Sequence, residues 1–229
     1  MSTQQQAPQP RGAGPRAETV ATPAGEARIT WHDARPAHTV LALGHGAGGG
    51  IEARDLRALA AALPARGVTV ALVEQPWRVA GKKVAPAPRT LDAAWSALWP
   101  ALALPGLPVI AGGRSAGARV ACRTAAALGA CAVLALSFPL HPPGRPEKSR
   151  AEELAAVELP VLVVQGGRDP FGRPEEFPAG TAPVEVPGAD HGFALPKSAE
   201  LTEAAAMELV TGAVTRWITG GREAWHGQG

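Results

Sequence analysis

Several marks of specialised protein classes are missing from this sequence of 229 residues. Only two cysteines occur, Cys122 and Cys131, and both stand among apolar, alanine-rich residues. This pattern gives no sign of a disulfide framework or of a CxxC metal site. We therefore expect two buried, reduced thiols and no bound metal.

The chain also carries little net charge. Its formal charge is +2 at pH 7, its Lys and Arg residues form no dense run, and its tryptophans are scattered. Proteins that bind nucleic acid usually present a basic patch or stripe, often with aromatic side chains that stack on bases. Nucleic acid is therefore not expected as a partner.

Long apolar runs are absent as well. Apolar residues make up 46% of the chain and charged residues 18%, which is the balance of a soluble globular protein. Residues 1–16 are polar and lack the apolar core of a signal peptide, so we expect a disordered tail on a cytoplasmic protein without a membrane partner. The length suits one domain, which we place at residues 17–220, followed by a C-terminal tail over residues 221–229.

What the sequence does contain is a regular alternation of short apolar runs and segments with helical spacing. Strands are predicted at residues 39–43, 68–73, 109–112, 131–136, 161–164 and 184–186, after a short hairpin formed by residues 18–20 and 27–31. Helices are predicted at residues 51–65, 91–102, 117–128 and 199–218. In the first helix, Arg54, Asp55 and Arg57 fall on the face opposite the apolar positions. The alternation predicts an α/β fold with a mostly parallel central sheet and helices on both faces.

In sheets of this kind, reactive groups gather at the carboxyl ends of the strands. The polar residues of this chain follow that rule, because a distinctive one stands just after each predicted core strand: His45, Glu74, Ser115, Ser137, Asp169 and His191. The sequence therefore predicts a functional site at one edge of the sheet.

The strongest motif is G-x-S-x-G at residues 113–117, between an apolar strand and an alanine-rich helix. A serine at such a turn adopts a strained backbone conformation, and small flanking residues let strand and helix approach closely enough to expose its hydroxyl. In isolation the motif also describes an ordinary tight turn. The position between a strand and a helix favours Ser115 as a nucleophile.

A serine hydroxyl becomes a good nucleophile only when a base takes its proton and a third group orients that base. Asp169 follows the strand at residues 161–164, and His191 follows the strand at residues 184–186. Each has an ordinary alternative, since an Asp after a strand often caps a helix and a loop His is often only solvated. The order Ser, Asp, His along the chain favours a catalytic triad.

Asp190 is the rival acid, because it directly precedes His191. A side chain in that position would have difficulty turning back to Nδ1 of the neighbouring ring. We therefore prefer Asp169 as the acid.

Hydrolysis also requires amide donors for the oxyanion. The glycine-rich loop at residues 44–50 follows the first core strand, and we nominate the amides of Ala47 and Ala116 for this role. A flexible loop or a phosphate cradle is the alternative, but the spacing of a phosphate-binding loop is not met. His45 is expected to brace the loop by hydrogen bonding.

The segments GHGAGG, GGRSAG, GGRDPFG and ADHGF resemble motifs of the α/β-hydrolase superfamily. Within it they resemble the small lidless, dienelactone-hydrolase-like branch, including hydrolase-like proteins related to a subunit of the NSL histone-acetyltransferase complex. The likeness covers about residues 39–218 and implies a triad of Ser115, Asp169 and His191 that works without a cofactor. The nucleophile is serine, unlike the cysteine of dienelactone hydrolases, which puts that substrate in doubt.

The resemblance leaves two function classes open. The first is a serine esterase or thioesterase that forms an acyl-enzyme, and the second is a catalytically silent scaffold that binds a partner protein, as some relatives in this branch do. Only about two dozen residues separate the strands ending at 136 and starting at 161, too few for a lid, so we expect an open site for small or exposed esters. Trp77 and Phe138 are candidate walls of that site. The chain is expected to act as a monomer or homodimer.

Overall fold

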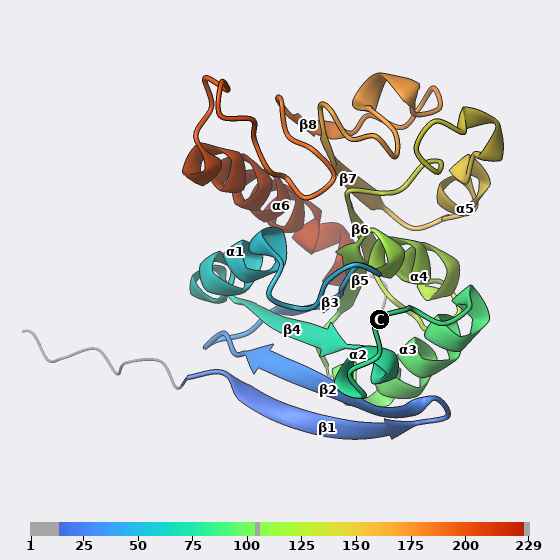
Figure 1. Cartoon of the computed structure of the whole chain (residues 1–229). Helices are drawn as coiled ribbons and strands as arrows, with labels where there is room; N and C mark the ends of the chain where they lie inside the picture. Colours follow the sequence, from blue (N-terminus) through green and yellow to red (C-terminus); the bar gives the residue numbers. More distant parts are fainter. Residues whose placement is uncertain (1–13, 104–105, 227–229) are drawn as a thin grey trace, which may run out of the picture.

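A single eight-stranded sheet forms the centre of the computed structural model, which describes residues 14–103 and 106–226 (Figure 1). The spatial order is β1-β2-β4-β3-β5-β6-β7-β8. Strands β3 to β8 run parallel, and β2 pairs antiparallel with both β1 and β4. The strands are β1 Arg16–Thr22, β2 Gly25–His32, β3 Thr39–Gly44, β4 Val68–Glu74, β5 Val109–Arg114, β6 Ala132–Leu136, β7 Val161–Gly166 and β8 Val184–Val186.

Helices cover both faces of this sheet. Helices α1 and α6 pack together on one face, and α3, α4 and α5 lie on the other (Figure 1). The helices are α1 Arg54–Ala62, α2 Pro76–Val79, α3 Pro88–Leu102, α4 Ala116–Thr124, α5 Ala151–Ala155 and α6 Glu203–His226, with 3-10 turns at Pro64–Arg66, Pro146–Lys148 and Pro174–Glu176. The predicted fold class is confirmed.

Several element bounds differ from the prediction. The helix expected at residues 51–65 is shorter, because Pro64 starts a separate 3-10 turn. Helix α6 continues past residue 218 to His226 and takes in residues 221–226 of the predicted C-terminal tail. The predicted N-terminal tail lies outside the described residues as far as residue 13, and Arg16, its last residue, already belongs to β1. Residues 227–229 are likewise outside the described part.

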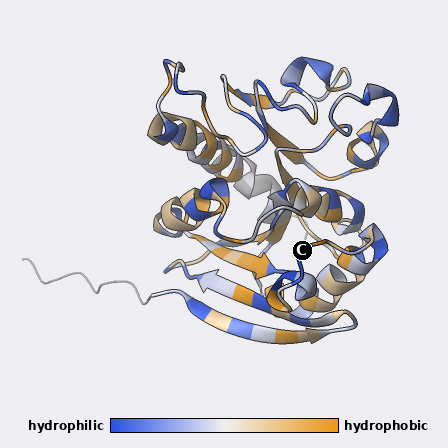
Figure 2. Cartoon of the chain, viewed as in Figure 1, coloured by the Kyte–Doolittle hydropathy of each residue, from blue (hydrophilic) through white to orange (hydrophobic). Residues whose placement is uncertain are grey.

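The apolar pattern explains why these strands occupy the middle of the sheet. Every residue of β3 is buried, as is all of β4 before its last residue, because helices shield both faces of the sheet. Figure 2 shows the contrast with β1, in which polar and apolar residues are mixed and every side chain is exposed or half-buried, as expected of an outer strand. Two apolar clusters, one on each face, hold the helices against the strands.

The backbones of β3 and α4 come very close at the carboxyl edge of the sheet. A Cβ atom on Gly117 would lie 2.5 Å from the carbonyl oxygen of Gly44, and one on Gly113 would lie 2.7 Å from the same oxygen. This oxygen belongs to the backbone of β3, which is fixed in the sheet, so it cannot move aside easily. Glycine is therefore required at residues 113 and 117 for the strand-to-helix turn to form.

This close approach makes a prediction for Gly117→Ala. The added methyl group has no space, so we expect the free energy of unfolding to fall by about 1–3 kcal/mol in urea denaturation. Gly220→Ala is the matched control, because Gly220 also lies in a helix but has no atom within 4 Å of its Cβ position. The control should be neutral or slightly stabilising. Equal stability of both variants would contradict the close contact at Gly44.

Candidate active site

Ser115 occupies the turn between β5 and α4. Its backbone has φ 53° and ψ −110°, a conformation that residues other than glycine rarely adopt. The strand holds this turn in place, because the Ser115 N–H donates to the Leu136 carbonyl of the neighbouring β6 at 2.9 Å. The hydroxyl is thereby presented at the carboxyl edge of the sheet.

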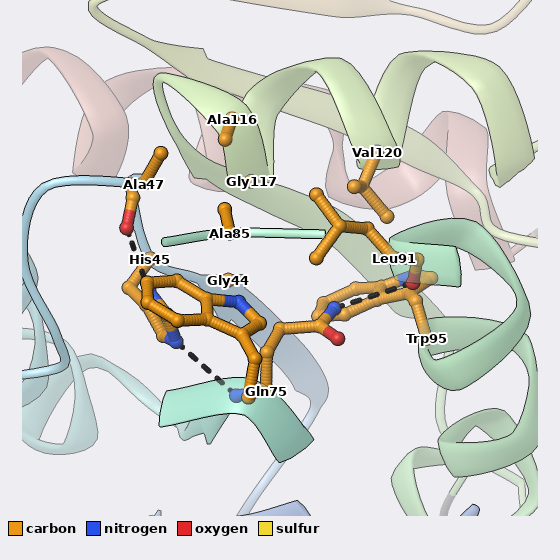
Figure 3. A pocket seen from close by; sticks show the side chains of 12 residues that line it. Gly44, His45, Ala47, Gln75, Ala85, Leu91, Trp95, Ala116, Gly117 and Val120 are labelled. Atoms are coloured by element: carbon orange, nitrogen blue, oxygen red, sulfur yellow. Dashed lines mark hydrogen bonds between the residues drawn. The ribbon is translucent and has the colours of Figure 1, made fainter. Parts of the chain in front are cut away.

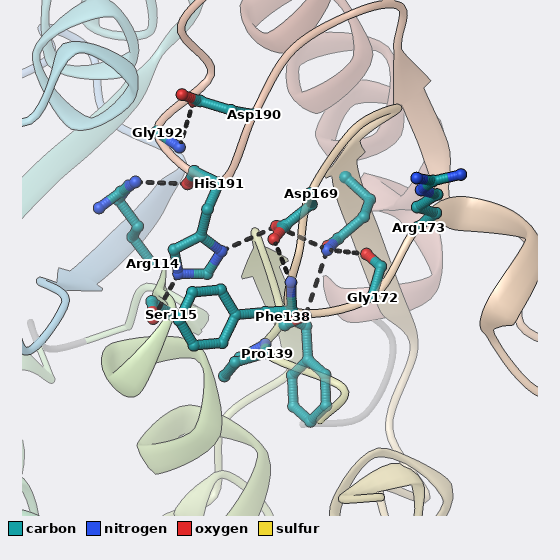
Figure 4. Close-up of polar contacts among 12 residues, drawn as sticks. Arg114, Ser115, Phe138, Pro139, Asp169, Gly172, Arg173, Asp190, His191 and Gly192 are labelled. Atoms are coloured by element: carbon teal, nitrogen blue, oxygen red, sulfur yellow. Dashed lines mark hydrogen bonds and ion pairs between the residues drawn. The ribbon is translucent and has the colours of Figure 1, made fainter. Parts of the chain in front are cut away.

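Three side chains from distant parts of the chain meet at this serine (Figure 4). The Ser115 Oγ lies 2.9 Å from Nε2 of His191, and Nδ1 of the same ring lies 2.8 Å from Oδ2 of Asp169. Asp169 comes from the loop after β7 and His191 from the loop after β8. The arrangement is a continuous hydrogen-bonded chain from carboxylate to imidazole to hydroxyl.

The carboxylate of Asp169 is fully buried and held by two further donors. Its Oδ1 accepts the N–H of Phe171 at 2.8 Å, and its Oδ2 accepts Nε2 of Gln165 at 2.9 Å. Gln165 is itself fixed, because Nε2 also donates to the Gly172 carbonyl at 2.8 Å. These contacts set the direction from which the carboxylate meets His191.

Asp190 has a different partner set. Its Oδ1 accepts the backbone N–H groups of Gly192 at 2.7 Å and Ala194 at 2.8 Å, so this carboxylate braces the loop that carries His191 (Figure 4). The acid that contacts the imidazole is Asp169.

A small cavity lies between the glycine-rich loop and the start of α4, where Ala116, the residue after Ser115, lines it (Figure 3). The centre of a water-sized sphere can occupy a volume of about 10 Å³ inside it. This is room for roughly one water-sized group. Ala47 and Ala116 both line it, so the structure brings the two nominated residues to the same space. The Ala116 N–H is the first of α4 and has no carbonyl partner within the helix.

The cavity carries no charge. His45, the titratable residue in its lining, contacts the Gly46 carbonyl through Nδ1 at 2.8 Å and accepts the Gln75 N–H at Nε2 at 3.1 Å. Burial lowers the pKa of His45, so its ring is neutral at pH 7. His45 thus joins the glycine-rich loop to the end of β4.

The two candidate walls have different positions. Trp77 lines the cavity and packs against His45, with ring centroids 5.5 Å apart. The expectation for Phe138 is wrong: its side chain is fully buried and contacts Phe177 in the core, with ring centroids 6.5 Å apart. Its ring belongs to the apolar cluster on the face covered by α3, α4 and α5, and it does not line the cavity.

Sequence reasoning missed several residues around the triad. Phe171 stacks on the His191 ring with centroids 4.2 Å apart, and Gln165 holds Asp169 as described. Asp55, expected on the polar face of its helix, is fully buried and lies 3.3 Å from Nε of Arg114. The signal available in the sequence was Arg114 itself, because a charged residue inside a glycine-rich strand end needs a carboxylate nearby.

The described part of the chain shows neither a metal-binding cluster nor a membrane-spanning helix. Among residues 14–103 and 106–226, no group of three or more His, Cys, Asp or Glu side chains is arranged to hold a metal ion. In the same residues, no helix is long and apolar enough to cross a membrane. The arrangement instead suits nucleophilic attack by a hydroxyl on a carbonyl group.

Comparison with known proteins gives a match to one family. The profile of the alpha/beta hydrolase domain matches residues 37–219. No curated protein sequence matches the chain significantly.

Solved structures of several bacterial proteins share the fold. A serine hydrolase without a lid from Xanthomonas campestris has 20% identity and a TM-score of 0.69, over 90% of this chain and 96% of its own. A dienelactone hydrolase from Anabaena variabilis has 19% identity and a TM-score of 0.68, over 90% and 97%. A thermophilic esterase from Thermogutta terrifontis has 16% identity and a TM-score of 0.60, over 92% and 99%. The predicted resemblance to the lidless branch is confirmed, and the likeness to NSL-related proteins stays a prediction.

The environment of the two thiols leads to a prediction about reactivity. Burial raises the pKa of Cys122 to about 12 and that of Cys131 to about 11. At pH 8 the fraction of each thiol that is present as the reactive thiolate is then on the order of one in a thousand or lower. We expect no reaction of the native protein with Ellman's reagent at pH 8 and reaction of both thiols in urea. Rapid reaction of a native thiol would contradict this environment.

Proposed function

Because this chain belongs to the alpha/beta hydrolase family, we propose that it is a serine hydrolase that cleaves small or exposed esters or thioesters. One observation carries the proposal: the unbroken hydrogen-bonded chain from Asp169 through His191 to Ser115. A protein that served only as a scaffold would have no physical need for this alignment. The same proposal assigns the three residues the roles of orienting acid, base and nucleophile.

The proposed reaction begins with attack of Ser115 Oγ on the carbonyl carbon of the substrate. His191 Nε2 takes the hydroxyl proton as the new C–O bond forms, and the carbonyl oxygen becomes an oxyanion. The amides of Ala47 and Ala116 bind that oxyanion, because both line the cavity beside the serine. Collapse of the intermediate breaks the bond to the alcohol or thiol, which leaves with the proton from His191.

The second half of the reaction releases the acid. His191, now neutral, takes a proton from water as the water oxygen attacks the acyl carbon. Collapse of the second intermediate returns that proton to Ser115 Oγ, and the carboxylic acid leaves. Throughout, Asp169 stabilises the imidazolium form of His191 and keeps its Nδ1–H directed away from the serine.

The cavity supports a short acyl group as the substrate of this reaction. It starts at the nominated amides and is closed by the side chains of Leu91, Trp95 and Val120 (Figure 3). With room for roughly one water-sized group, it suits an acetyl-sized chain. The segment between β6 and β7 contains only a 3-10 turn and the five residues of α5, so nothing of lid size covers the site.

A fluorophosphonate probe tests the proposed nucleophile, because it phosphonylates activated serines. We expect labelling of the wild-type protein and complete loss of labelling in Ser115→Ala. Ser137→Ala is the matched control, since Ser137 also stands at a strand end with a positive φ of 45° but its side chain is fully buried. That control should label normally. A folded wild-type protein that takes no label would contradict the hydrolase and favour the scaffold.

The size of the cavity makes a separate prediction about chain length. With p-nitrophenyl esters, we expect kcat/KM to fall from acetate to butyrate to octanoate. Leu91→Ala removes part of the cavity wall and should raise kcat/KM for butyrate relative to acetate by about tenfold, since a methylene in a fitted pocket changes discrimination by roughly that factor or more. The control is Leu98→Ala, a buried leucine of the same helix outside the cavity lining, which should leave the ratio unchanged. A wild-type preference for octanoate would refute the short acyl site.

A further inference from the structure

Arg114 occupies the variable position before the serine in G-x-S-x-G, and its side chain touches three other segments. Its Nη2 donates to the carbonyl oxygen of His191 (Figure 4). Its Nη1 lies against the glycine-rich loop, where a Cβ atom on Gly46 would be 3.4 Å away. Its Nε lies 3.3 Å from Oδ2 of Asp55 in helix α1. One guanidinium on the nucleophile turn therefore binds the histidine loop, pairs with helix α1 and lies beside the glycine-rich loop.

The ion pair between Arg114 and Asp55 differs from an ordinary surface ion pair because both side chains are largely buried. The side chain of Arg114 is 14% exposed and that of Asp55 is 0% exposed. Desolvation raises the pKa of Asp55, and the charge of Arg114 opposes that rise. Nε of Arg114 and Oδ2 of Asp55 are close, but they are not aligned as a hydrogen bond. Asp55 therefore acts on the guanidinium mainly through its charge.

The shape of the guanidinium explains why an arginine suits this position. Its nitrogens form a rigid planar fork that can face several partners at once, whereas a lysine ammonium is a single point on a flexible stem. The fork directs Nη2 to the histidine loop while Nη1 faces the glycine-rich loop. A lysine at residue 114 would keep the charge beside Asp55 but could not at the same time donate to the histidine loop as the fork does.

We propose that Arg114 is a positioning residue for the reaction, and that Asp55 is its buried counter-ion. Asp169 and Phe171 fix the ring of His191, whereas Arg114 fixes the backbone that carries this ring. The inference rests on the proposed function, in which His191 is the base. Arg114 makes no contact with the reacting atoms, so its effect passes through the position of His191 relative to Ser115.

The test uses Arg114→Ala and measures ester hydrolysis with and without added guanidinium ion. We expect kcat to fall by about 100-fold with little change in KM, because a small misplacement of a catalytic group costs about that factor. Guanidinium at concentrations too low to unfold the protein should restore part of kcat by filling the vacated space. Arg119→Ala is the matched control, since Arg119 is a partly buried arginine of α4 whose guanidinium donates to both carboxylate oxygens of Glu153 and not to the histidine loop. Wild-type protein and this control should not respond to guanidinium.

A second readout does not depend on turnover. The Nδ1 proton of His191, held against Asp169, should give a low-field proton NMR signal in the wild type and in Arg119→Ala. We expect this signal to be lost in Arg114→Ala and to return with guanidinium. Should Arg114→Ala fail to fold, Arg114→Lys replaces it, with the same loss of kcat and signal expected.

The outcomes separate this inference from the proposed function. A wild-type protein without ester hydrolysis refutes the proposed function, and the NMR signal then still tests the positioning role. A folded Arg114 variant with unchanged kcat and an intact Nδ1 signal overturns the inference. Loss of kcat with no response to guanidinium and with the signal preserved overturns it as well.

Discussion

Where β3 ends and α4 begins, two backbones lie closer together than side chains would permit. The carbonyl of Gly44 fills the space in which Gly113 and Gly117 would carry their Cβ atoms. Because the sheet fixes β3 beside β5, the glycine-rich loop that leaves Gly44 has to pass directly beside Ser115. The position of the cavity, and of Ala47 opposite Ala116 in it, follows from this contact.

Much of this layout could be predicted from local sequence. Buried parallel strands appear as continuous apolar runs, and the topology of such sheets places whatever follows them at one edge. Those two rules, together with the G-x-S-x-G motif and the order Ser, Asp, His along the chain, led to the prediction that Ser115, Asp169 and His191 meet. The choice of Asp169 over Asp190 also followed from local geometry, because a side chain directly before His191 has difficulty turning back to Nδ1 of that ring. In the structure, Asp190 is engaged by the amides of its own loop.

What could not be predicted depends on contacts between distant segments. Helical spacing places Asp55 opposite the apolar residues of α1, but Arg114 from β5 lies on that side and buries it. Phe138 follows a strand as a site residue would, yet its ring turns toward Phe177. The last helix, predicted to end at residue 218, instead continues to His226, and the ring of Trp225 packs on Trp217 with centroids 5.1 Å apart. For Asp55 and Phe138, a partner far along the chain decides the outcome.

The lining of the cavity comes entirely from residues 44 to 120, whereas the aspartate and histidine come from residues 169 and 191. In the proposed reaction, the residues that line the acyl site and those that move the proton therefore come from separate parts of the chain, which meet at the turn of Arg114 and Ser115. Changes in the stretch between β4 and α3 would reshape what enters the site while the proton path stays intact.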